Sequence, residues 1–161
     1  MTSLELCRQE RAKELARFVK VLRAVPGSRP DYRPDPKSRT ATEIAWLLAQ
    51  SEASLLKLIE TGEIQWSESK PEATLDAIVS AFEKNAEAVN EEIGKLDESA
   101  WGKKVRFVME GAPAWEDTLE AFVWGFLFDS IHHRGQLTTY LRPMGGKVPA
   151  VYGPSADDSG Q

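Results

Sequence analysis

The sequence has few of the features that mark secreted, membrane-spanning or nucleic-acid-binding proteins. Its 161 residues include a single cysteine, Cys7, so no disulfide can form within the chain, which suits a reducing cytoplasm. No apolar run approaches the roughly 20 residues of a membrane-spanning helix. Charged residues also begin at Glu5, too early for a signal peptide. The net charge of -5 offers no basic surface to nucleic acid. We therefore expect a cytoplasmic protein without membrane or nucleic-acid partners.

Four stretches have the three- and four-residue apolar spacing of amphipathic helices. They cover residues 4–22, 40–62, 72–93 and 115–141. Thr40 and Glu43 resemble a capping box at the start of the second stretch, and Gly62 is a plausible end for it. Long helices separated by loops predict an all-α fold, a four-helix bundle.

The remaining segments predict less regular structure. Val105, Phe107 and Met109 alternate with other residues, so a short strand or hairpin is possible before the last helix. The segment 148–154 carries enough apolar residues to pack, whereas residues 155–161 are expected to fray. We see no repeat and no linker, which predicts one domain spanning residues 1–161.

The predicted fourth helix is apolar on every side between Phe122 and Phe128. Such a helix has to be covered all round. Each helix of a four-helix monomer turns one side to water, so we expect a homodimer that buries Trp124 or Phe128.

Into this apolar stretch the sequence places Asp129, His132 and His133. Asp129 and His133 are four residues apart, hence about 40° apart around the helix and one turn apart along it. A carboxylate and an imidazole in that relation can bind one cation. The same pair can also be an internal ion pair or hydrogen bond that satisfies buried polar groups. The spacing leaves both interpretations open.

The end of this helix resembles a known family. The residues that carry the resemblance are His132-His133-Arg134-Gly135-Gln136-Leu137, Tyr140-Leu141-Arg142 and Val151-Tyr152-Gly153-Pro154-Ser155. They are similar to the DinB-like (damage-inducible) family. The resemblance implies an up-down-down-up four-helix bundle, usually dimeric, with a metal site between the second and fourth helices. It also implies a metal-dependent thiol transferase or a related isomerase that uses a low-molecular-weight thiol.

The resemblance also implies which residues bind the metal. The family has three histidines, and the last of them falls on His133. The preceding one falls on Asp129, where aspartate shifts the preference toward harder cations. The ligand from the second helix falls on Leu47, which cannot bind a metal. Three side chains are candidate substitutes for the missing ligand: Glu52, Glu43 and His132.

Two functions are consistent with these residues. The first is a thiol S-transferase dependent on zinc, nickel or manganese, with Asp129 and His133 as metal ligands and with His132 or Gln136 supporting them. The alternative is a non-catalytic, small-molecule-binding or stress-related dimer with a degenerate metal site, which the leucine at position 47 favours. A role on DNA ranks last because the charge of the chain opposes it. We assign the aromatic residues Trp46, Trp66 and Trp124 to the core.

Overall fold

Four long helices dominate the computed structural model, which describes residues 1–71 and 73–160. They are α1 (Ser3–Arg23), α2 (Ala41–Thr61), α3 (Leu75–Lys95) and α5 (Leu119–Leu141). A threonine caps the start of each helix by accepting a backbone hydrogen bond: Thr2, Thr40, Thr74 and Thr118. The capping box of Thr40 with Glu43 is present, and Gly62 ends α2 with a φ of 78°, as the sequence predicts.

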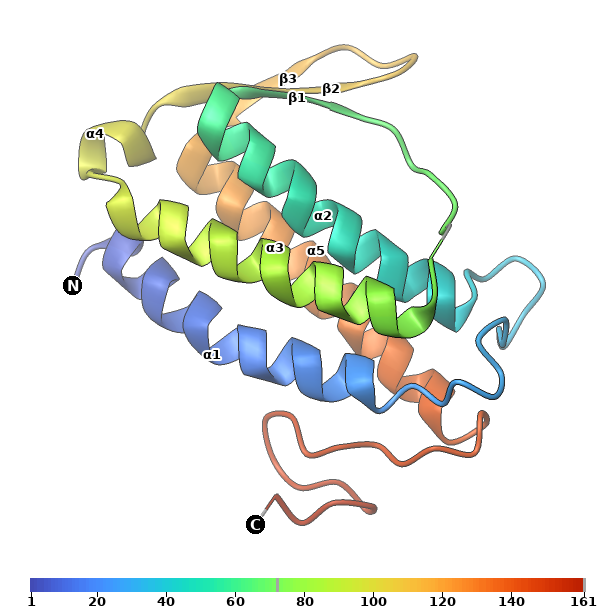
Figure 1. Cartoon of the computed structure of the whole chain (residues 1–161). Helices are drawn as coiled ribbons and strands as arrows, with labels where there is room; N and C mark the ends of the chain where they lie inside the picture. Colours follow the sequence, from blue (N-terminus) through green and yellow to red (C-terminus); the bar gives the residue numbers. More distant parts are fainter. Residues whose placement is uncertain (72, 161) are drawn as a thin grey trace.

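The helices pack side by side around an apolar core (Figure 1). A loop that contains Pro26, Pro30, Pro34 and Pro36 carries the chain from α1 to α2. After α2 the chain returns along the bundle, so that α3 begins near the end where α2 begins (Figure 1). No helix within residues 1–71 and 73–160 is long and apolar enough to cross a membrane.

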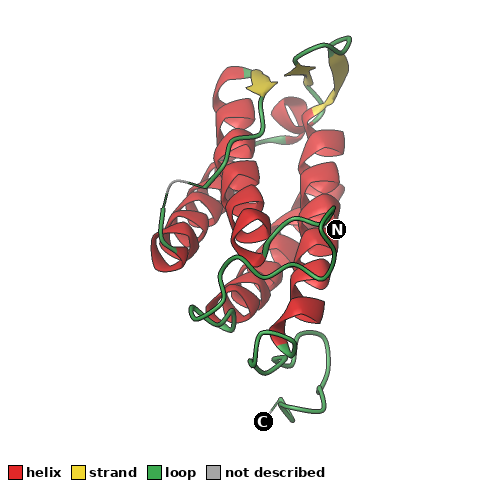
Figure 2. Cartoon of the chain, turned by 90° about the vertical axis from the view of Figure 1, so that its right-hand side faces the viewer, coloured by secondary structure: helices red, strands yellow, loops and turns green. Residues whose placement is uncertain are grey.

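A small sheet lies across the end of the bundle where α2 ends and α5 begins (Figures 1 and 2). Its strands are β1 (Glu63–Trp66), β2 (Lys104–Met109) and β3 (Trp115–Thr118). The pair β1 and β2 is parallel, whereas β2 and β3 form an antiparallel hairpin. A one-turn helix, α4 (Glu98–Trp101), precedes β2.

The sheet confirms one prediction and corrects two. The hairpin expected around Val105 to Met109 is present. The expected start of the last helix at Trp115 is wrong, because residues 115–118 pair with β2 and Thr118 caps the helix that follows. The fold is therefore mostly helical with a small sheet rather than purely α. Strand β1 was not predicted, since four residues directly after a helix carry little periodic signal.

Two buried ion pairs cross the bundle. Arg134 of α5 pairs with Glu14 of α1, and both side chains are at most 5% exposed. Burial favours the neutral carboxyl of Glu14, but hydrogen bonds from Arg134 and Arg17 outweigh it and lower the pKa of Glu14. In the second pair, Arg11 binds Glu52 at 2.6 Å. Arg134 of the recognised motif thus has a structural role.

The C-terminal tail is anchored by polar contacts. Tyr152 accepts a hydrogen bond from Arg134 (2.6 Å) and donates one to Glu14 (3.1 Å). Asp158 accepts from the backbone of Ala150 at 2.8 Å and pairs with Lys20 at 3.0 Å. Tyr152 lies in the segment 148–154, which was expected to pack, whereas Asp158 lies in the segment 155–161, which was expected to fray.

Candidate functional site

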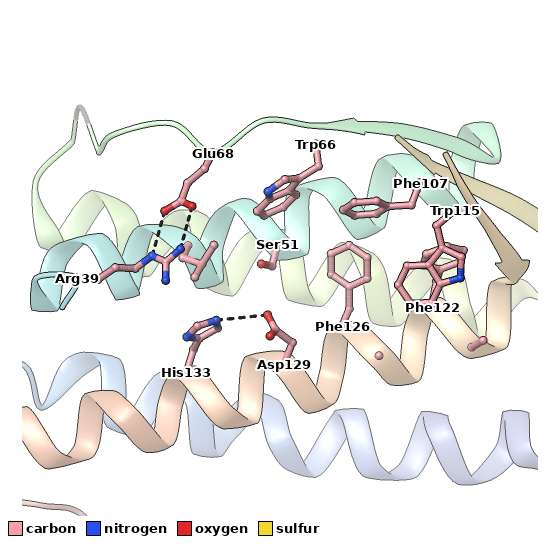
Figure 3. A pocket seen from close by; sticks show the side chains of 13 residues that line it. Arg39, Ser51, Trp66, Glu68, Phe107, Trp115, Phe122, Phe126, Asp129 and His133 are labelled. Atoms are coloured by element: carbon pink, nitrogen blue, oxygen red, sulfur yellow. Dashed lines mark hydrogen bonds and ion pairs between the residues drawn. The ribbon is translucent and has the colours of Figure 1, made fainter. Parts of the chain in front are cut away.

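A pocket of about 390 Å³ opens between α2, α5 and the strands, and it has a polar end and an aromatic end (Figure 3). At the polar end lie charged side chains from the loop before α2, from the segment after β1 and from α5: Arg39, Glu68, Asp129 and His133. The aromatic end is built by five rings: Trp66, Phe107, Trp115, Phe122 and Phe126. This arrangement suits an amphipathic molecule.

The rings of the aromatic end pack on one another in pairs. Phe107 of β2 stacks on Trp66 of β1 at 6.3 Å between centroids and on Phe122 of α5 at 6.1 Å. Phe126 and Trp115 complete the wall at 6.2 Å from Phe107 and 5.0 Å from Phe122. The sheet therefore has a direct part in the pocket, because it brings rings from β1, β2 and β3 against α5.

Arg39 and Glu68 form a two-pronged ion pair at the polar end (Figure 3). The arginine donates to both carboxylate oxygens, at 3.0 and 2.9 Å. The segment that carries Glu68 is held against α2, since Gln50 donates to the carbonyl of Ser67 at 2.8 Å and Trp46 donates to Ser69 at 3.1 Å. The hydrogen bond from Arg39 lowers the pKa of Glu68, so the pair stays ionised near neutral pH.

Asp129 and His133 face each other across one turn of α5. The distance between Asp129 Oδ2 and His133 Nε2 is 3.5 Å (Figure 3). The side chain of His133 is 13% exposed and that of Asp129 is 60% exposed. On the far side of the ring, Nδ1 of His133 donates to Oε1 of Gln136 at 2.8 Å. Gln136 thus orients the imidazole and turns Nε2 toward Asp129.

Within the described residues, none of the candidate substitutes for the third metal ligand completes a three-donor set with this pair. Leu47 lines the pocket with its hydrocarbon side chain. Glu52 is buried and pairs with Arg11. Glu43 accepts a hydrogen bond from the backbone N–H of Thr40 at 2.7 Å. His132 is exposed and meets the ring of His133 edge-on.

The donor set in this pocket does not fit a resident divalent metal. Across the described part of the chain, no three histidine, cysteine, aspartate or glutamate side chains come together where they could hold a metal ion. Asp129 and His133 supply two donors, whereas a protein-bound zinc ion takes three or four protein ligands. The leucine in the third position supplies no donor atom.

The sequence did not predict most of the pocket. Trp66 lines the cavity rather than the core, while Trp124 does pack against the core clusters. The pocket also explains part of the all-round apolarity of α5. Phe122, Val123 and Leu127 are buried, and Phe126 and Gly125 face the cavity. Phe128, in contrast, is 62% exposed and stacks on Trp124.

Comparisons with known proteins agree with this fold. A model of the DinB family matches residues 3–161. The chain is similar in structure to a DinB-like protein from Bacillus cereus ATCC 10987, with 19% identity, coverage of 92% of this chain and 97% of that chain, and a TM-score of 0.77. A second structure, a DinB-like protein (YjoA) from Bacillus subtilis, has 17% identity, coverage of 88% and 93%, and a TM-score of 0.68. At these identities the likeness concerns the fold. No curated protein matches the chain.

Proposed function

This chain belongs to the DinB family, since the family model covers residues 3–161, and on that premise we propose that it is a small-molecule-binding bundle protein. Its ligand binds in the pocket between α2, α5 and the sheet. The observation that carries the proposal is the division of this pocket into five aromatic rings at one end and Arg39, Glu68, Asp129 and His133 at the other. The rings contact the apolar body of the ligand, and the charged groups fix its polar head.

The dimensions of the pocket support this function. Its volume of about 390 Å³ lies within the roughly 300–1,000 Å³ of small-molecule sites. The polar groups are few and held in place, Arg39 by Glu68 and His133 by Gln136. A pocket whose polar groups are already oriented loses less entropy when a ligand binds.

Gly125 allows a direct test of the proposal. It lines the pocket, and a Cβ placed on it meets no described atom within 4 Å. Gly125→Leu therefore has room for its Cβ, places the rest of its side chain in the cavity, and adds about 1 kcal/mol of helix propensity. Gly135→Leu is the matched control, because Gly135 also lies in α5 with free space around it but does not line the pocket.

The experiment is a thermal-shift screen of small aromatic compounds against the three proteins. Compounds that bind the pocket stabilise the wild type and Gly135→Leu, by about 2.7 kcal/mol at 100 times the Kd. They do not raise the Tm of Gly125→Leu, although this variant without ligand is at least as stable as the wild type. Equal stabilisation of all three proteins contradicts binding in this pocket.

A second candidate function is that of a metal-dependent thiol S-transferase. Asp129 and His133 favour this function, because they line the same cavity with 3.5 Å between Asp129 Oδ2 and His133 Nε2. Leu47 opposes it, because a leucine in the third position cannot bind a metal. Elemental analysis of untagged protein beside Asp129→Ala and His133→Ala tests the requirement for metal. Near-stoichiometric zinc, nickel or manganese that is lost in both variants favours the transferase, and its absence after incubation with these ions removes it.

We further propose an up-down-down-up order of the four long helices and a homodimer. The helix directions in Figure 1 support the order. The stacked pair of Trp124 and the 62%-exposed Phe128 supports an interface on α5, since covering exposed aromatic surface stabilises an association. Sedimentation as a monomer at micromolar concentration contradicts the dimer.

A further inference from the structure

We propose that the ligand of the pocket is an organic cation, a protonated amine carried on an apolar body that contains a ring. This inference rests on the proposed function and deepens it by naming the chemical class of the ligand. It is based on how charges and hydrogen-bond acceptors are distributed at the polar end of the pocket.

The positive charge of Arg39 is already compensated. Glu68 accepts two hydrogen bonds from it, at 3.0 and 2.9 Å. These hydrogen bonds raise the pKa of Arg39, and more distant charges, among them that of Asp129, add to the effect. An anionic ligand at this arginine has to displace Glu68, and it brings a second negative charge toward Asp129. The pair thus opposes a carboxylate or a phosphate as the head group.

Within the described residues, no lysine or arginine pairs directly with the carboxylate of Asp129. Its polar contact is with Nε2 of His133, at 3.5 Å. The other ring nitrogen of His133 contacts Oε1 of Gln136 at 2.8 Å. The carboxylate of Asp129 therefore lines the cavity without a cationic partner of its own. An ammonium group, which has a positive charge and several N–H donors, satisfies this carboxylate.

The aromatic end suits the same class of ligand. Ring faces attract cations, by about 0.5–2 kcal/mol for each well-placed contact. Trp66 and Asp129 line the same pocket from opposite walls (Figure 3), so a ligand held by this carboxylate shares the cavity with the indole ring. The net charge of -5 on the chain also attracts cationic molecules from solution.

Three probes with one body and different head groups test the proposal: 3-phenylpropylamine, 3-phenylpropan-1-ol and 3-phenylpropanoate. Isothermal titration calorimetry at neutral pH gives the affinity of each probe for the wild type, Asp129→Asn and Glu87→Gln. Asp129 is largely exposed, so its replacement leaves the core intact. Glu87→Gln removes the same charge from an exposed position on α3 outside the pocket.

We expect the wild type to bind the amine about 10-fold or more tighter than the alcohol, and the acid most weakly, as for one charge-assisted hydrogen bond. Asp129→Asn should reduce this preference to within about 3-fold, and Glu87→Gln should keep it. Tighter binding of the acid, or a preference for the amine that survives in Asp129→Asn, overturns the inference and leaves the pocket as a binding site. Failure of all three probes to bind the wild type overturns the proposed function itself.

Discussion

Replacement of Leu47 by histidine tests why the pocket does not fit a metal. Leu47 is 5% exposed and lines the cavity that also contains Asp129 and His133. Histidine at this position supplies the third nitrogen or oxygen donor. In the absence of metal, Leu47→His loses the burial of a leucine side chain, which costs about 1.5–3 kcal/mol. Zinc at 100 times its Kd stabilises the folded state of this variant by about 2.7 kcal/mol.

For a chain of this size, that stabilisation corresponds to a rise of roughly 5–11 °C in Tm. Scanning calorimetry with and without zinc measures it in the wild type, Leu47→His and Leu47→His/His133→Ala. We expect a zinc-dependent rise in Leu47→His, little change in the wild type, and loss of the rise in the double variant. An equal rise in the wild type, or none in Leu47→His, refutes the reasoning that the missing third ligand is what excludes the metal.

Three further predictions concern the core and the surface of α5. Arg134→Met should lower the free energy of unfolding by about 3–5 kcal/mol, because it leaves Glu14 buried without its main partner. Adding Glu14→Gln should restore part of that loss in urea denaturation, and no recovery would contradict the pairing. The pKa of Glu14 lies below its ordinary value of 4.5 in the folded protein. Its ionised pair therefore stabilises the fold fully above about pH 4.5 and less as the pH falls through the lower folded pKa. The stability difference between the wild type and Glu14→Gln should thus shrink only on acidification, and a difference that shrinks toward alkaline pH would contradict it. Phe128→Glu should shift a dimer to monomer in sedimentation without lowering Tm of the monomer, since Phe128 is 62% exposed; an unchanged dimer would place the interface elsewhere.

The sequence predicts the helical part of this fold well because each helix carries its own signals. The capping box at Thr40 and Glu43 and the left-handed Gly62 are local features, readable from a few neighbouring residues. The sheet is harder to predict. Strand β1 has four residues and pairs with β2, which lies some forty positions further along the chain. No local pattern encodes that pairing. Residues 115–118 are a strand because they pair with the other edge of β2.

The candidate site was predictable in part for the same reason. Asp129 and His133 share one helix, so their spacing places them together, and the hydrogen bond from His133 to Gln136 lies within the same turns. Arg39 and Glu68 come from two loops, and their meeting depends on how α2 and β1 are placed. The ion pair of Glu52 with Arg11 could not be predicted either, because Arg11 lies on another helix.

The central claim is that the pocket between α2, α5 and the sheet binds a small molecule. The most direct measurement is a heteronuclear NMR titration that follows the indole N–H signals while each of the three phenylpropyl probes is added. Trp66 and Trp115 line the pocket, whereas Trp101 is 1% exposed and does not line it. We predict that at least one probe shifts the signals of Trp66 and Trp115 in a saturable way and leaves that of Trp101 in place. Signals that do not move with any probe, or that move equally for all three tryptophans, would contradict the account.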